Sequence, residues 1–387
     1  MNAIEHWWRD PAARAAAQGF DRAAIVESAI AVQQIPAPTF DERLRGAYVA
    51  ERMRAVGLAD VSVDAVGNVY GRRDGRSDAP GLLIAAHMDT VFPAGTDLSV
   101  RREGGRIYGP GLGDNSLGVA ALLHLAAALV RHAVPNERAI WFVANVGEEG
   151  LGDLRGMRAA VDRLDGRIGA AIALEGCDPG RIIHAGLGVR RYRISAAADG
   201  GHSWADFGAP SAVHALVRLA AQLSRLDVPR APRSSFNIGV IEGGSSVNTI
   251  AERAALLLDL RSVEPDGLAA LVWQVEQAVS AAHTAEPGVR FELATVGDRP
   301  SGGIAPEHPL VLAAAESYHV EGFTIGYTIA STDANIPLSR GIPAVCVGVC
   351  DGSNEHRLDE YIEPARLQAG MRALLWLALA ASGSHIT

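Results

Sequence analysis

Four short apolar runs, each followed by residue types that bind metal ions, constrain the fold of this chain more than any other feature. The runs occupy 82–86, 139–146, 170–174 and 343–349. Each has the length and composition of a strand buried on both faces, as in a sheet covered by helices. They are followed in turn by His87 and Asp89, by Glu148 and Glu149, by Glu175, and by Glu355 and His356. Sites in open α/β sheets form at the carboxyl ends of the strands, so these side chains are expected to converge.

Asp114 adds a carboxylate in a glycine-rich turn before a predicted helix over 116–130. Two imidazoles and several carboxylates at one place repel one another unless a cation lies among them, and a divalent metal suits such donors. Each residue also has a structural interpretation. Asp114 fits a helix N-cap, the pair Glu148 and Glu149 fits a solvated acidic turn, and a single histidine after a strand is usually structural. The combination favours a metal site.

The pattern of the whole chain predicts an α/β fold with an insertion. Thr39 and Glu42 form a capping-box pattern before a helix that runs towards Val56, and a last helix is expected over 364–381. Between these, strand and helix patterns follow one another in the order of a ferredoxin-like βαββαβ unit, over 190–198, 210–226, 236–241, 254–261, 265–282 and 289–296. We therefore expect one domain over 1–188 and 299–387, and an inserted domain over 189–298.

Composition excludes several classes of protein. The 387 residues carry a net charge of −9, from 35 basic and 44 acidic residues, which argues against nucleic-acid binding. Three cysteines, at 177, 346 and 350, are too few for a disulfide framework and fit a reducing cytoplasm. The longest apolar run, near 373–381, has about half of the ~18 residues of a membrane span. The first ten residues lack the apolar core of a signal peptide. We expect a soluble cytoplasmic protein without membrane partners.

Five motifs, in order and at fitting distances, resemble the M20 family of zinc-dependent metallopeptidases and amidohydrolases. They are LIAAHMDTV at 83–91, GPGLGDN at 109–115, GEEG at 147–150, LEG at 174–176 and NEHRLDE at 354–360. This family includes glutamate carboxypeptidase, aminoacylase-1, succinyl-diaminopimelate desuccinylase and peptidase T. The likeness covers nearly the whole chain. It implies a zinc-exopeptidase-like catalytic domain, with a mixed central sheet and helices on both faces, and an inserted lid domain.

The resemblance implies two divalent ions per chain, bound by His87, Asp114, Glu149, Glu175 and His356. Asp114 would bridge the two ions, and Asp89 would hold the second ring nitrogen of His87. Glu148 would be the general base, taking a proton from the water between the ions and passing it to the leaving nitrogen. Zinc is the expected metal, and cobalt or manganese accept the same ligands.

The lid also carries matching residues. His202, in GGHS at 200–203, resembles the family histidine that reaches a neighbouring active site across a dimer and would stabilise the oxyanion. Asn248 and Arg261 match lid positions that could hold a substrate carboxylate, and Arg261 also fits a structural ion pair. The resemblance therefore implies a homodimer formed through the lid, which would also cover an exposed sheet edge.

We expect hydrolysis of an amide or peptide-like C–N bond in a small substrate, such as a dipeptide or an N-acyl amino acid. Ser116, where many relatives have lysine, and Ser203-Trp204, where Ala-Gly is common, leave open an aminohydrolase or deacylase of non-peptide amines. Glu175 in place of aspartate leans towards the carboxypeptidase and deacylase branches. A metal-bound binding protein without turnover is the alternative from another class, and the intact Glu148 argues against it. No G-x-S-x-G elbow supports a serine hydrolase.

Overall fold

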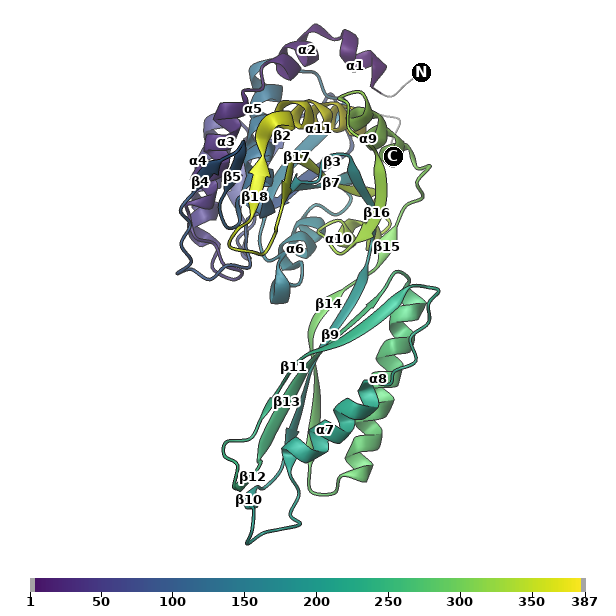
Figure 1. Cartoon of the computed structure of the whole chain (residues 1–387). Coiled ribbons are helices and arrows are strands. Elements are labelled where there is room, and N and C mark those ends of the chain that lie inside the picture. Colours follow the sequence, from purple (N-terminus) through teal and green to yellow (C-terminus); the bar gives the residue numbers. More distant parts are fainter. Residues whose placement is uncertain (1–3, 384–387) are drawn as a thin grey trace. The chain divides into compact units, whose positions relative to one another are not determined.

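The computed structural model describes residues 4–383, and the chain divides into two compact units (Figure 1). The first unit contains the chain up to Gly186 and again from Gly303, and the second spans Leu187–Gly302. The second unit is therefore an insertion within the first. Each unit has a sheet and a hydrophobic core of its own.

The sheet of the first unit is mixed. Its four central strands are parallel neighbours, in the order β6 (Arg138–Asn145), β3 (Ser77–His87), β7 (Ile168–Cys177) and β17 (Ala344–Ser353). Antiparallel strands extend it on both sides: β2 (Val69–Arg73) and β1 (Ala59–Val63) beyond β6, and β18 (Tyr361–Glu363), β5 (Arg106–Tyr108) and β4 (Arg101–Glu103) beyond β17. Three further strands lie off this path. The strand β8 (Arg181–Gly186) pairs with β17, and both β15 (Gly302–Gly303) and β16 (Gly326–Ala330) pair with β8. The predicted α/β fold with a mixed central sheet is confirmed.

Helices cover both faces of this sheet, because its central strands are apolar on both sides. In β3, Leu82 and Ile84 pack into one core while Leu83 and Ala85 pack into the other. Each fully buried Leu or Ile side chain stabilises the fold by roughly 1.5–3 kcal/mol. The larger core contains residues of α2 (Pro11–Gln18), α3 (Arg22–Gln33), α4 (Arg43–Val56), α5 (Gly118–Arg131), α9 (Pro309–His319) and α11 (Leu367–Ala381). The smaller one contains residues of α6 (Arg155–Arg163) and α10 (Asn335–Ser339).

The predicted capping box before α4 is wrong. Glu42 is the N-cap residue, but neither its side chain nor that of Thr39 caps the helix. The Thr39 hydroxyl donates to Asp89 at 2.9 Å, and Glu42 forms an ion pair with Arg155 at 2.7 Å. Both side chains have partners from distant parts of the chain, and the one local backbone amide that Glu42 binds is the N–H of Phe40, at 3.0 Å, which precedes the helix.

Asp114 does not cap a helix either. It lies in a π-helical turn, η1 (Leu112–Leu117), with backbone angles of φ −109° and ψ 95° that are not helical. The following helix α5 begins only at Gly118. The structural alternative for Asp114 as an N-cap is therefore excluded, and its carboxylate is left for other partners.

The second unit has the element order β9 (Gly188–Ala197), α7 (Ala212–Leu223), β11 (Ser234–Gly243), β13 (Arg253–Ser262), α8 (Pro265–Ala285) and β14 (Arg290–Arg299). The four strands form an antiparallel sheet in the order β11-β13-β9-β14. Apolar side chains of α7 and α8, among them Leu216 and Leu271, pack with one face of this sheet. A second, two-stranded sheet joins β10 (Gly201–His202) to β12 (Thr249–Ile250).

One helical stretch among residues 4–383, Leu112–Arg131, is long and apolar enough by composition to cross a membrane. Its most apolar window is 72% buried within the structure, as expected of a helix in the core of a protein. The apolar run near 373–381 lies in α11 and is likewise buried.

Candidate metal centre

His87 ends β3, and its side chain is buried beside two carboxylates. Its Nε2 atom lies 3.1 Å from Oδ1 of Asp114 and 3.5 Å from Oε2 of Glu175. Glu175 lies in β7, the strand next to β3, and the strand continues two residues beyond it. The carboxyl ends of neighbouring parallel strands thus bring these donors together, as the topology requires.

The second oxygen of Asp114 faces a second imidazole. Oδ2 lies 3.0 Å from Nε2 of His356, and that nitrogen lies 3.1 Å from Oε1 of Glu149. His356 follows β17 and is about half exposed, whereas Glu149 follows β6 and is buried. Asp114 therefore lies between two histidines, and each histidine is also close to a different glutamate.

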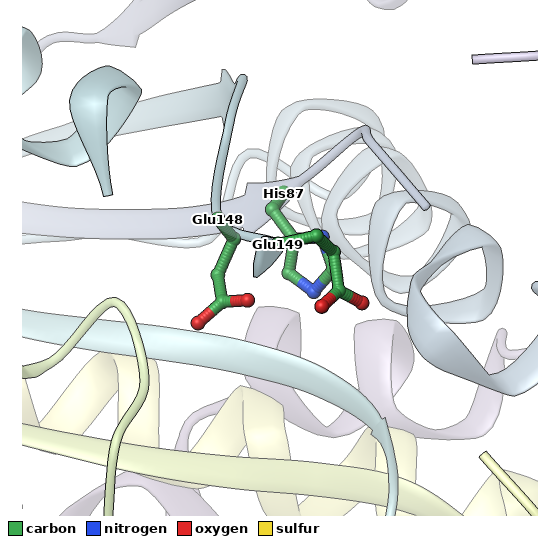
Figure 2. Close-up of side chains that lie close together, drawn as sticks. All are labelled: His87, Glu148 and Glu149. Carbon is green, nitrogen blue, oxygen red and sulfur yellow. The ribbon is translucent and has the colours of Figure 1, made fainter. Parts of the chain in front are cut away.

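Ligand atoms gather into three clusters within the described residues. In each cluster they lie within 4.8 Å of one another, and the members are His87, Asp114 and Glu175; Asp114, Glu149 and His356; and His87, Glu148 and Glu149 (Figure 2). The first two clusters share Asp114, so the arrangement offers two adjacent positions with one carboxylate in common. Imidazole nitrogens and carboxylate oxygens at such distances are able to bind divalent metal ions.

Asp89 fixes the turn that carries both glutamates. Its Oδ1 accepts the backbone N–H of Glu148 at 2.9 Å, and its Oδ2 accepts that of Glu149 at 3.0 Å. The Nδ1 atom of His87 lies 3.1 Å from the Asp89 carbonyl oxygen and 3.5 Å from Oδ1. One buried carboxylate thus orients the turn, while its own carbonyl oxygen is the nearer partner of the imidazole.

Gly147 allows the bend before this turn. Its φ is 64°, a conformation that favours glycine, and a Cβ here would lie 2.7 Å from side-chain atoms of Arg155. The bend lets the adjacent Glu148 and Glu149 side chains both lie near His87, although neighbours on a straight strand point to opposite faces (Figure 2).

Glu360 holds the loop that presents Asp114, a role that sequence reasoning missed. Its buried carboxylate accepts the backbone N–H groups of Gly111, Gly113 and Asp114 at 2.9, 2.6 and 2.9 Å. The one feature of the sequence that could have pointed to this role is the position of Glu360 at the end of the motif at 354–360. The loop it holds lies about 250 residues earlier in the chain, with 246 positions separating it from Asp114.

The pKa values of the site show how its charges are balanced. Burial raises the pKa of Glu149 and of Glu175 to about 7. Hydrogen bonds that His356 donates to Asp114 and Glu149 raise its pKa to about 11. Burial lowers the pKa of His87, but Glu175 and Asp114 outweigh it and hold the pKa well above its usual value. Protons on the imidazoles therefore balance the carboxylates in the metal-free chain, and divalent ions fit the same donors with more charge.

The remaining predicted residues lie in the second unit. His202 is exposed, and its Nδ1 accepts the N–H groups of Trp204 and Ala205 at 3.2 and 3.3 Å. The pairing of β10 with β12 places His202 opposite Thr249, beside Asn248. Arg261, in β13, forms an ion pair with Asp259 at 2.7 Å. The structure thus brings His202 close to Asn248. Arg261 instead forms an ion pair, which is the structural role considered for it in the sequence.

Residues 83–380 match the model of peptidase family M20/M25/M40. Among curated proteins, succinyl-diaminopimelate desuccinylase of Corynebacterium glutamicum is 26% identical, over 84% of this chain and 88% of the relative. Carboxypeptidase G2 of a Pseudomonas species is 25% identical, over 85% of this chain and 80% of the relative.

Solved structures match the whole fold. Aminopeptidase PepT from Bacillus cereus superposes with a TM-score of 0.76 at 21% identity, covering 94% of this chain and 99% of its own. A tripeptidase from Staphylococcus aureus gives a TM-score of 0.77 at 22% identity, with the same coverage. At these identities the likeness establishes the fold.

Proposed function

This chain belongs to peptidase family M20/M25/M40 and is a hydrolase of amide or peptide bonds, and we propose that it uses two metal ions to cleave a small N-acyl amino acid or dipeptide. The position of Asp114 carries this proposal. A carboxylate with one oxygen against each of two histidines, each paired with its own glutamate, is suited to bridge two cations. A single-ion site has no need of the second histidine and glutamate.

In this proposal His87 and Glu175 hold one ion, His356 and Glu149 hold the other, and Asp114 holds both. Zinc is the proposed metal, with cobalt and manganese suited to the same donors. When bound, the two ions supply Lewis acidity for the scissile carbonyl and lower the pKa of water. Asp89 and Glu360 act on the ligands by fixing the turn after β6 and the loop that carries Asp114.

Glu148 is the proposed general base. It is 7% exposed, its backbone is held by Asp89, and it lies beside the ligands His87 and Glu149. It takes a proton from the attacking water and gives it to the leaving nitrogen, a role worth about 10²–10⁴ in rate. A protein that only binds metal needs no such side chain next to its ligands.

The second unit is proposed as the ferredoxin-like lid and dimerisation domain, over 189–298, with the catalytic domain over 1–188 and 299–387. Because the Nδ1 atom of His202 accepts two backbone N–H groups, its proton belongs on Nε2. That N–H is the donor proposed for the oxyanion. Asn248 and Arg261 are proposed to hold a substrate carboxylate. Arg261 would either keep its ion pair with Asp259 while it does so or exchange that ion pair for the substrate. The cytoplasm is the proposed compartment.

Substrate panels test this function most sharply. The purified chain, loaded with zinc, cobalt or manganese, is assayed with dipeptides, N-acyl amino acids and aryl amides. We expect hydrolysis of a dipeptide or an N-acyl amino acid, and hydrolysis of aryl amides alone would support the non-peptide alternative. Ser116, one basis of that alternative, is fully buried.

The variant Glu148→Gln tests the base. It should keep the wild-type metal content, measured by elemental analysis, and lose activity by about 10²–10⁴-fold, because the amide cannot accept a proton. The matched control is Glu137→Gln, an exposed glutamate outside the site. Activity near that of the control would remove Glu148 as the base.

A further inference from the structure

Asn145 and Asp333 form a buried pair beside the site that the mechanism has not used. The Nδ2 group of Asn145 donates to Oδ2 of Asp333 at 2.7 Å, and the two residues are 0% and 2% exposed. The other oxygen of each side chain, Oδ1 of Asn145 and Oδ1 of Asp333, is buried without a hydrogen-bond partner. Two acceptor oxygens, one on each of these hydrogen-bonded residues, therefore lack a donor, and buried polar groups rarely lack a hydrogen-bond partner.

A single proton on Asp333 would give both oxygens a hydrogen bond, because one of them would donate it and the other would accept it. An ionised carboxylate only accepts hydrogen bonds, whereas a protonated carboxyl group also donates one. We propose that Asp333 is held as the neutral acid and that its Oδ1–H donates to Oδ1 of Asn145, so that acid and amide form a ring of two hydrogen bonds. The two oxygens without hydrogen-bond partners are the donor and the acceptor of the second hydrogen bond of this ring.

The pair lies where it can position the proposed base. Asn145 is the last residue of β6, stands opposite His87 in the sheet, and accepts the N–H of Met88 at 2.7 Å through its carbonyl oxygen. The chain reaches Glu148 three residues later, while Asp333 comes from the segment just before α10. Asp333 is therefore a positioning residue: it fixes the end of β6 without adding a charge to a cluster that already holds five carboxylates.

The surroundings favour the neutral form. Glu148 after β6, Glu175 of β7, His87 of β3 and Cys346 of β17 are the titratable groups that act on Asp333. Burial and the charge of Glu148 raise its pKa to about 8, against smaller opposing effects of His87 and Asn145. The electrostatics thus act in the direction that the missing hydrogen bonds require.

The protonation state is tested through unfolding of the full chain, with and without zinc, in wild type and Asp333→Asn. An unfolded aspartate ionises near pH 4, so the wild type releases this proton on unfolding between about pH 5 and pH 7, and the variant has none to release. We expect the unfolding constant of the wild type, relative to that of the variant, to rise about tenfold per pH unit in this range. A ratio independent of pH overturns the proposal, and the exposed Asp165→Asn is the matched control.

Two further measurements keep the test independent of folding and of activity. Glu149, Glu175 and Glu360 also have raised pKa values, so the test is the infrared difference between the wild type and Asp333→Asn near neutral pH. The wild type should show the band of one additional protonated carboxyl group, and a difference spectrum without that band overturns the proposal. Asp333→Leu should lower kcat at unchanged metal content, and Asp333→Asn should restore it, because only the amide can donate to Asn145. The positioning role rests on the proposed function, whereas the infrared and unfolding results hold even if no substrate is cleaved.

Discussion

Asp114 divides its two carboxyl oxygens between His87 and His356, at 3.1 and 3.0 Å. Glu149 also has a carboxylate oxygen within 4.8 Å of a ring nitrogen of each histidine, but among the described residues Asp114 is the one that places a separate oxygen against each of them. Burial alone would raise the pKa of Asp114, but the hydrogen bonds from the two histidines hold it below its usual value. A permanently ionised carboxylate at this place is what a bridging ligand requires.

Replacement of this residue gives the first prediction at the scale of the residue. Asp114→Ala should reduce the divalent metal content from two ions per chain to one or none, because both positions lose a shared ligand. Elemental analysis of the dialysed protein measures this, with the exposed Asp165→Ala as the control. Two ions retained by Asp114→Ala would remove it as the bridge.

At the scale of the element, the loop before α5 depends on a carboxylate from the other end of the chain. Glu360 accepts three backbone N–H groups of this loop, those of Gly111, Gly113 and Asp114. The loop is therefore built from both ends of the first unit, and the position of Asp114 depends on it.

Removal of this acceptor should destabilise the fold. Glu360→Ala leaves three buried N–H groups without their partner, and at about 1–3 kcal/mol for each unsatisfied group the free energy of unfolding should fall by about 3 kcal/mol or more. Urea denaturation measures the loss. Glu355→Ala, an exposed residue of the same motif, is the control, and equal stability of the two variants would contradict the role of Glu360.

At the scale of the whole molecule, the proposed metal site implies that metal ions and protons compete for one set of groups. In the metal-free chain, the folded state raises the pKa of Glu149 and Glu175 from 4.5 to about 7, and that of His356 from 6.5 to about 11. The folded state therefore binds more protons than the unfolded state across these ranges, and stability falls as pH rises through them. Asp114 has the opposite sign, but its effect is confined to pH values below about 4.

Stabilisation by metal should consequently increase with pH. In the proposed site, zinc would displace the protons of the histidines and glutamates, which becomes easier as pH rises, while the metal-free chain becomes less stable. We expect the rise in melting temperature on adding zinc to be larger at about pH 8 than at about pH 6. A zinc effect that is the same at both pH values would contradict the competition.

The sequence was sufficient to predict the central strands and that histidines and carboxylates converge at their ends. Buried parallel strands have continuous apolar runs, and a sheet brings their carboxyl ends together, so His87, Glu149 and Glu175 could be placed without coordinates. The three-residue strands β4, β5 and β18 were missed because so few residues carry no periodic signal.

Interactions between distant segments could not be predicted. Thr39 and Glu42 have the spacing of a capping box, but Asp89 and Arg155 bind them instead, and nothing near residue 40 reveals those partners. Glu360 lies in a run of exposed charged residues, and only the fold shows that it turns inward to a loop. Local patterns determine elements, whereas the partners of buried polar groups depend on the assembled chain.

The central claim is that Asp114 bridges two metal ions, and anomalous diffraction at the zinc edge from crystals of the zinc-loaded chain tests it most directly. We predict two zinc peaks, one bound by His87 and Glu175, the other by His356 and Glu149, with one oxygen of Asp114 at each. A single peak, or ions that do not contact Asp114, would contradict the account.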